Sequence, residues 1–143
     1  MNFSNIDWIN AVVGKPWVDR AAGPNAFDCW GLVTDSFERI DGIKLDATPG
    51  YIDGEPIEAI GNIHREQLNW PEHAATDGAV FCVYISNGTM IHVGRILLVN
   101  KVGLFAVHAA GKNGVGQVVA EPLRVLQQRY GDRLKYYVRP QHG

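Results

Sequence analysis

The sequence has few cysteines, no excess of basic residues and no metal-binding motif. Its 143 residues include two cysteines, Cys29 and Cys82, and neither belongs to a Cys-x-x-Cys pair. A disulfide framework is therefore not expected. The five histidines show no HExxH spacing, so we expect neither a structural metal nor a metal centre. The net charge of −2 leaves no basic surplus to neutralise phosphates, which disfavours binding to nucleic acid.

The start of the sequence does not resemble a targeting segment, and none is expected. The first ten residues have no basic start, and Asn2, Ser4, Asn5 and Asp7 interrupt their apolar character. The longest apolar stretches, such as residues 96–99, have the length of a strand and not of a membrane span. The pattern predicts neither a secretion signal nor contact with a membrane, so we expect cytoplasmic synthesis and export only by other machinery.

The composition is typical of one folded domain spanning residues 1–143. Hydrophobic residues make up 46% and charged residues 20% of the chain. The first half shows helical periodicity. The predicted helices cover residues 5–13, with Ser4 as a cap, residues 28–40, ending at Asp41-Gly42, and more weakly residues 57–68.

The second half of the chain changes to strand patterns. Runs rich in β-branched and apolar residues are separated by hairpin signals such as Asn87-Gly88. The predicted strands cover residues 79–85, 90–99, 104–110, 115–120 and 134–138, with a helix over residues 122–130. Helices followed by antiparallel strands indicate an α+β domain, in which N-terminal helices pack on a C-terminal antiparallel sheet.

Cys29 stands where a loop rich in glycine, proline and asparagine leads into the second predicted helix. Unpaired backbone N–H groups and the dipole at a helix start lower the pKa of a thiol, and the thiolate is the nucleophilic form of cysteine. The same N–H groups can stabilise an oxyanion, and Gly31 leaves space beside the sulfur. Position alone fits a buried, unreactive cysteine equally well.

Two histidines, His92 and His108, interrupt neighbouring apolar strands. If the loop between them is centred on Asn100, the two residues face each other directly, with Cβ atoms about 4.5–5.5 Å apart. One imidazole can then hydrogen-bond to the other and fix its tautomer. A two-residue turn at Asn100-Lys101 would instead put the rings on opposite faces. The hypothesis therefore requires an odd-length loop or a bulge, for which Gly103 is a suitable site.

These three residues match the minimal apparatus for acyl transfer. Cys29 attacks a carbonyl, His92 takes the thiol proton and returns it to the leaving amine, and His108 holds the ring of His92. Water then releases the acyl group.

Five sequence blocks, in order along most of the chain, resemble the NlpC-type cell-wall cysteine peptidases, which are papain-like enzymes of bacteria and their phages. The blocks are Gly14-Lys15-Pro16-Trp17, residues 27–33, residues 77–81, His92-Val93-Gly94 and Val107-His108-Ala109. The resemblance implies a papain-like fold with the nucleophile at a helix N-terminus and an open substrate groove. It also implies no cofactor and hydrolysis of peptide bonds in peptidoglycan stem peptides, typically between D-glutamate and a diamino acid. The family's nucleophile falls on Cys29, its base on His92 and its polar third residue on His108.

Two tryptophans depart from the family's pattern, and both are candidates for substrate binding. Trp17 replaces a tyrosine whose hydroxyl lies close to the catalytic cysteine in the family, and it offers only an indole N–H donor. Trp30 replaces the serine that usually follows the cysteine. It can narrow the groove or pack in the core, and packing is the favoured reading.

Family members with tryptophan after the cysteine resemble phage-tail-associated proteins. We therefore expect a phage or prophage peptidoglycan peptidase that is incorporated in the tail, with other tail proteins as partners. Two alternatives stay open. One is a tail-assembly protein that keeps the peptidase fold with little or no turnover, and the other is a secreted cell-wall-degrading toxin.

Two further residues have simpler expected roles. Asp28 can cap the second helix or tune the thiol beside it. Capping is favoured, because a carboxylate next to a thiolate raises the pKa of the thiol. Cys82 alternates with apolar residues in a strand and is expected in the core.

Overall fold

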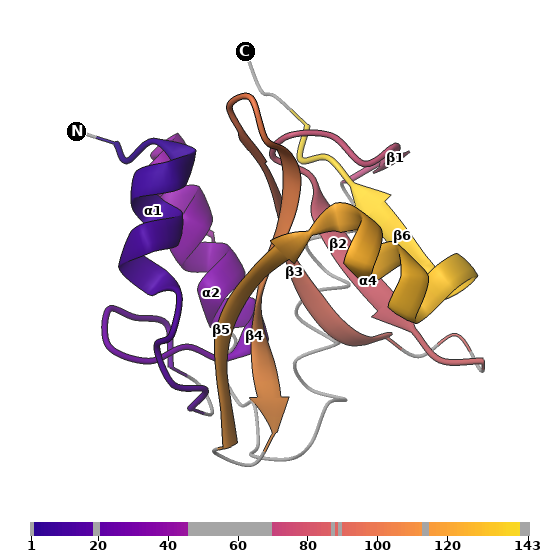
Figure 1. Cartoon of the computed structure of the whole chain (residues 1–143), viewed down its shortest axis with the longest axis horizontal. Coiled ribbons are helices and arrows are strands. Elements are labelled where there is room, and N and C mark those ends of the chain that lie inside the picture. The colour runs from indigo at the N-terminus through magenta and orange to yellow at the C-terminus, as the bar shows by residue number, and fades with distance from the viewer. Residues whose placement is uncertain are drawn as a thin grey trace.

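The computed structural model describes residues 2–18, 21–45, 70–86, 88, 90–112 and 115–140. Helices come first and strands second, except for one late helix (Figure 1). The helical elements are α1 (Asn5–Val12), α2 (Cys29–Ser36), the π-helix η1 (Phe37–Asp41), α4 (Leu123–Tyr130) and the 3-10 turn η2 (Gly131–Arg133). The strands are β1 (Glu72–His73), β2 (Val80–Tyr84), β3 (Met90–Val99), β4 (Gly103–Lys112), β5 (Val115–Pro122) and β6 (Leu134–Tyr137).

In the described part of the chain, the strands form one antiparallel sheet in the order β1-β6-β2-β3-β4-β5. Strands β2 to β5 follow one another as a meander, and β6 returns after α4 to pair with β2. This arrangement confirms the α+β class predicted from the sequence. The short edge strand β1 has no counterpart among the predicted strands.

The helix boundaries follow their capping residues. Ser4 Oγ accepts a hydrogen bond of 3.2 Å from the backbone N–H of Asp7, which confirms the predicted cap of α1. Helix α2 continues directly into η1, which ends at Gly42 in the left-handed conformation, as predicted. The helix predicted over residues 57–68 lies outside the described residues. No helix of the described segments has the length and apolar character needed to cross a membrane.

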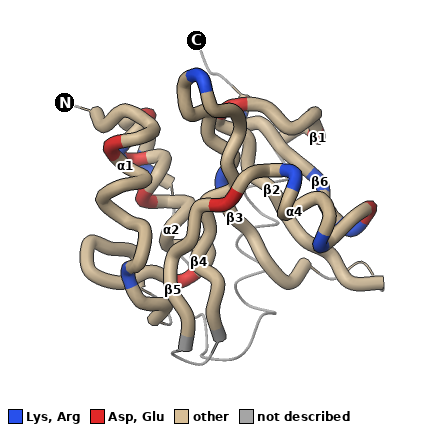
Figure 2. Tube along the Cα trace, in the orientation of Figure 1, with Lys and Arg blue, Asp and Glu red and all other residues tan. Residues whose placement is uncertain are grey.

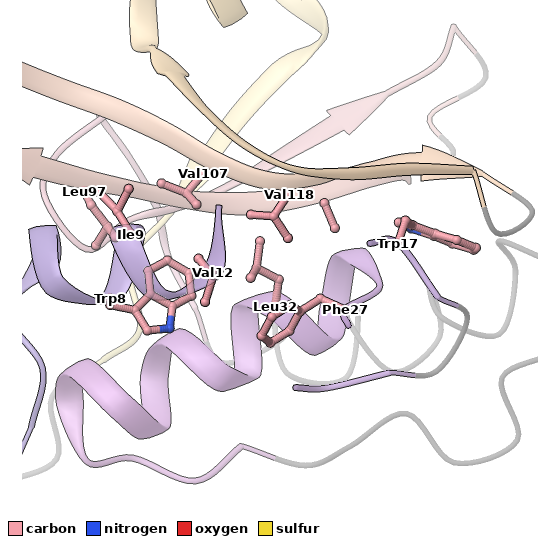
Figure 3. Packing of buried hydrophobic residues seen from close by; sticks show 10 residues of the cluster. Trp8, Ile9, Val12, Trp17, Phe27, Leu32, Leu97, Val107 and Val118 are labelled. Atoms are coloured by element: carbon pink, nitrogen blue, oxygen red, sulfur yellow. The ribbon is translucent and has the colours of Figure 1, made fainter. Parts of the chain in front are cut away.

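Hydrophobic clusters cover both faces of the sheet. On one face, α1 and α2 pack against β3, β4 and β5 (Figures 1 and 3). Residues of this cluster include Trp8, Ile9, Val12, Leu32, Leu97, Val107 and Val118. On the opposite face, Leu126 of α4 packs with Phe81, Val83, Ile96 and Ala106. Because successive strand residues point to opposite faces, β3 and β4 contribute side chains to both clusters.

The connection between β3 and β4 sets the positions of the two histidines. It is a three-residue loop, residues 100–102, in which Lys101 has a φ of 68°. The predicted odd-length loop is therefore confirmed, but its centre lies one residue later than predicted. Extending the observed register sets His108 opposite Gly94, so the predicted direct pairing of His92 with His108 is wrong. The two histidines are instead diagonal neighbours on one face of the sheet.

A buried arginine joins β3 to the end of the second helix. Arg95 Nη1 lies 2.8 Å from Asp41 Oδ2 and donates to Ser36 Oγ at 3.0 Å. Its Nε donates to the carbonyl of Gly78 at 3.0 Å, and its guanidinium lies 3.6 Å from the centre of the Phe37 ring. These contacts fix α2 and η1 against the strand that carries His92.

Candidate active site

Cys29 is the first residue of α2 and is half-buried. The carboxylate of Asp28 accepts a hydrogen bond of 2.6 Å from the N–H of Gly31, which confirms its capping role. The N–H of Asp28 donates to the carbonyl of Ala21 at 2.9 Å, so the preceding loop folds onto the first turn. A Cβ atom at residue 31 would overlap that carbonyl. The space at Gly31 is therefore taken by the loop, which holds the helix start in place.

The electrostatic surroundings of Cys29 act in opposite directions. Burial is the largest effect and the negative charge of Asp28 is the second, and together they raise the pKa of the thiol to about 12. The backbone N–H groups of Trp30, Cys29 and Val93 lower this pKa without overcoming burial. The helix start thus provides the stabilisation predicted for a thiolate, but the thiol is predominantly protonated at neutral pH.

His92 and His108 are joined by a hydrogen bond. His92 Nε2 and His108 Nδ1 lie 2.8 Å apart, and the ring centres are 4.9 Å apart. The ring of Phe81 contacts both imidazoles edge-on, at 5.9 and 5.5 Å between ring centres. The imidazoles therefore share the sheet face of the Phe81 cluster, as the sequence predicted when it placed them on one face.

Both histidines are neutral at neutral pH. Burial, and then the neighbouring His108, lower the pKa of His92 to about 3. Burial also lowers the pKa of His108, although Glu121 acts in the opposite direction. A neutral imidazole carries one proton and one lone pair, so His92 is able to accept a proton.

Cys29 meets the β3 strand at the residue next to His92. The thiol interacts with the backbone N–H of Val93, and the Val93 side chain belongs to the same cluster as Trp30. Pairing between β3 and β4 reaches only Arg95 on this side, so the stretch around Val93 is not paired with β4. The structure therefore brings the thiol to the backbone beside His92. The hydrogen bond between His92 and His108 uses Nε2, which leaves Nδ1 as the ring nitrogen for a second partner.

Two charged residues extend the histidine pair, and sequence reasoning missed both. His108 Nε2 lies 3.0 Å from Glu121 Oε1 at the end of β5. Arg129 of α4 binds both carboxylate oxygens of Glu121, at 2.8 and 3.0 Å. Figure 2 shows the acidic position at the end of β5 followed by basic positions in α4. The sequence held one signal: an acidic residue follows the apolar strand expected beside the strand of His108.

The two tryptophans expected to bind substrate are almost fully buried. Trp17 is 6% exposed and lies at one end of the cluster beneath β5 (Figure 3). Trp30 is 2% exposed and packs with Val33, Phe37 and Val93. The favoured packing role of Trp30 is confirmed. Burial argues against the substrate-binding role for both rings, because little of either surface remains to contact a ligand.

Within the described segments, Cys82 and the titratable groups are the candidates for a second centre. Cys82 is fully buried among apolar side chains, as predicted, and both cysteines are free thiols. Among the described residues, no group of three or more histidine, cysteine, aspartate or glutamate side chains is placed to hold a metal ion.

Comparison with known proteins agrees with the geometry. The model of the NlpC/P60 family matches residues 14–119. The fold is similar to the crystal structure of the NlpC/p60 domain of the peptidoglycan hydrolase SagA. The TM-score is 0.55 at 16% identity, and the match covers 94% of this chain and 95% of that one.

A second similar structure is described as similar to a lipoprotein of the NLP/P60 family, from Staphylococcus aureus subsp. aureus Mu50. Its TM-score is 0.59 at 19% identity, and the match covers 99% of this chain but 44% of that protein. At these sequence identities, the similarity to the two structures is evidence for the fold alone. A search of curated proteins finds no match.

Proposed function

Because this chain belongs to the NlpC/P60 family, we propose that it is a cysteine peptidase that hydrolyses amide bonds in the stem peptides of peptidoglycan. The observation that carries the proposal is the hydrogen bond of 2.8 Å between His92 and His108, together with the contact of the Cys29 thiol with the backbone N–H of Val93, the residue that follows His92. The structurally similar SagA domain belongs to a peptidoglycan hydrolase, which supports the choice of substrate.

The proposed mechanism starts from a neutral thiol and a neutral imidazole. The sulfur of Cys29 attacks the carbonyl carbon while its proton passes to Nδ1 of His92. The N–H groups of Cys29 and Trp30, at the start of α2, are positioned to stabilise the oxyanion that develops. The carbon–nitrogen bond then breaks, and His92 gives the proton to the leaving amine. A water molecule, deprotonated by His92, finally hydrolyses the thioester and restores the thiol.

His108 takes the third role in this proposal. It is 2% exposed and makes its hydrogen bond to Nε2 of His92, on the side of the ring away from the proposed reaction. That contact holds the imidazole in one orientation.

We also propose that the enzyme acts as part of a phage or prophage tail. The support is in the sequence: Trp30 follows Cys29, as in family members that resemble tail-associated proteins. In that setting the protein reaches peptidoglycan with the particle, and other tail proteins are its partners. Purified particles would contain the chain, and antibodies against it would label the tail.

A tail-assembly protein with little or no turnover is the second candidate. The observation that favours it is the pKa of Cys29, which burial and Asp28 raise to about 12. Such a protein would bind tail partners equally well with and without the thiol.

The test uses purified peptidoglycan and measures release of stem-peptide fragments. The peptidase proposal expects release by the unmodified protein and a loss of at least about a hundredfold in Cys29→Ala. Cys82→Ala is the matched control, because it removes the other cysteine, which is buried in the core. The fraction of this variant that folds should release peptides at the rate of the unmodified protein. Equal release by Cys29→Ala would exclude the thiol mechanism. No release by any form, with tail binding retained, would favour the assembly role.

A further inference from the structure

Beyond the histidine pair, the hydrogen bonds continue across three strands. His92 on β3, His108 on β4 and Glu121 on β5 each occupy the diagonal position relative to the next, all on one face of the sheet. The line ends at Arg129 on α4, which holds both oxygens of the Glu121 carboxylate. Four side chains from four elements are thus linked by contacts of 2.8 to 3.0 Å.

The donor and the acceptor of each hydrogen bond in this chain of side chains can be assigned. An ionised carboxylate only accepts hydrogen bonds, so its partner, Nε2 of His108, must carry the proton. In a neutral ring, Nδ1 of His108 then has the lone pair and must accept. The donor to it can only be Nε2–H of His92. Since neutral His92 has its single proton on Nε2, its free lone pair lies on Nδ1.

We propose that Glu121, held by Arg129, fixes the tautomers of both histidines and thereby makes Nδ1 the basic nitrogen of His92. The catalytic consequence rests on the proposed function, in which this lone pair receives the proton of Cys29. Glu121 is a positioning residue here, because it acts on the reaction through two imidazoles without touching the substrate.

The surroundings favour this role over an ordinary surface ion pair. His108 is 2% exposed, so water has little access to replace the carboxylate at Nε2. Arg129 and His108 both lower the pKa of Glu121, with the hydrogen bonds from Arg129 as the largest cause, so the carboxylate stays ionised and acceptor-only. The bidentate grip of Arg129 also fixes the orientation of the carboxylate, since two parallel contacts remove its rotation.

Without the carboxylate, the donor and the acceptor of the hydrogen bond between the two imidazoles can be exchanged. His108 can then carry its proton on Nδ1 and donate to Nε2 of His92. The proton of His92 moves to Nδ1, where it blocks uptake of the thiol proton. We therefore expect loss of turnover without loss of substrate binding.

The test combines kinetics with nuclear magnetic resonance of the imidazole nitrogens in the full chain. In the unmodified protein, both histidines should show a protonated Nε2 and an unprotonated Nδ1. Glu121→Gln should introduce the opposite tautomer, because an amide can also donate. It should lower kcat roughly tenfold to a hundredfold with KM changed less than about twofold. Arg129→Lys, which keeps the charge and loses the bidentate contact, should show a smaller change of the same kind.

Glu72→Gln is the matched control, because Glu72 is an exposed carboxylate whose ion pair with Lys135 spans 3.9 Å. It should change neither spectrum nor kcat. A protonated Nδ1 on His108 in the unmodified protein would overturn the proposal without any variant, and so would an unaltered spectrum and kcat in folded Glu121→Gln. If the tautomers are as expected but the protein hydrolyses no peptidoglycan, the tautomer assignment stands and the peptidase function fails.

Discussion

A Cβ atom at Gly94 would lie 2.8 Å from the Cβ atom of His108 and would overlap the ring of Phe81. The missing side chain at residue 94 leaves room for the Phe81 ring and for the Cβ atom of His108, whose ring makes the diagonal contact with His92. The glycine after the His92-Val93 pair is therefore a requirement of the histidine contact as well as of core packing.

Gly94→Ala should damage stability and turnover together. Because the new methyl group forces Phe81 or His108 to move, we expect a loss of about 1–3 kcal/mol in the free energy of unfolding. We also expect a loss of activity larger than that destabilisation explains, since the hydrogen bond between the imidazoles is stretched. Urea unfolding and peptide release, measured on the folded fraction, check both effects. Unchanged turnover in the variant would show that the diagonal contact does not depend on this space.

The order of elements was predictable from the sequence, whereas the shared face of the histidines was predictable only on the condition of an odd-length loop or a bulge. Period-two apolar strands determine which side chains share a face once the loop length is known, and the three-residue loop of the structure meets that condition. The register was not predictable. It depends on the left-handed conformation of Lys101, and a lysine gives no sign of a positive φ.

The contact between His108 and Glu121 and the charge state of Cys29 could not be predicted from the sequence, for a different reason. Glu121 meets His108 only because β4 and β5 pair in one register, with His108 opposite Val119. The raised pKa of Cys29 comes chiefly from burial, which depends on how α2 packs against β3. A pattern along the chain shows the helix start, but not how much of the sulfur the packing covers.

Reaction of Cys29 with a thiol probe should show a steep dependence on alkaline pH. Burial and Asp28 raise the pKa of this thiol to about 12, so the labelling rate should rise throughout the alkaline range. An ordinary cysteine would instead reach a midpoint near pH ~8.5. Native Cys29→Ala is the control and should remain unlabelled, because Cys82 is fully buried. A plateau reached below neutral pH would mean that the resting thiol is already ionised.

Asp28→Asn should make Cys29 more reactive at each pH. Asparagine caps a helix about as well as aspartate, so we expect the free energy of unfolding to change by less than about 0.5 kcal/mol. The substitution removes the negative charge that raises the pKa of the neighbouring thiol, so more thiolate is present. The same labelling experiment measures the difference. A slower reaction in this variant would show that Asp28 assists the thiolate instead of opposing it.

Acid should destabilise the fold through His92. The pKa of this residue is about 3 in the folded chain and about 6.5 when it is unperturbed. Between these values the unfolded chain binds a proton that the folded chain does not, so the free energy of unfolding falls as pH falls. The contribution is on the order of a few kcal/mol across this window. His92→Gln should show a shallower slope, with the part due to His108 retained. Denaturant titrations at pH values between 3 and 7 compare the two proteins, and parallel slopes would contradict the assigned protonation.

Removal of the Arg95 charge from the sheet should cause a large loss in the free energy of unfolding. It is buried, and Arg95→Met would break its contacts with Asp41, Ser36 and the carbonyl of Gly78. Removal of one partner from a fully buried ion pair costs about 3–5 kcal/mol. Because the Asp41 side chain is 33% exposed and water can solvate it, we expect a loss near the lower end of this range. Arg95→Lys keeps the charge but loses the second donor and the planar contact with Phe37, so its loss should be intermediate. Urea unfolding measures all three proteins.

Lys135→Ala gives the matched comparison for Arg95. Its ion pair with Glu72 spans 3.9 Å, and about half or more of each side chain is exposed, so its removal should cost less than about 1 kcal/mol. Because Arg95 also ties the end of α2 and η1 to β3, its loss should loosen Cys29 against the strand of His92. Peptide release by folded Arg95→Lys should therefore fall, whereas release by Lys135→Ala should not. Equal stability and equal turnover in the two variants would show that the arginine does not hold the helix against the strand.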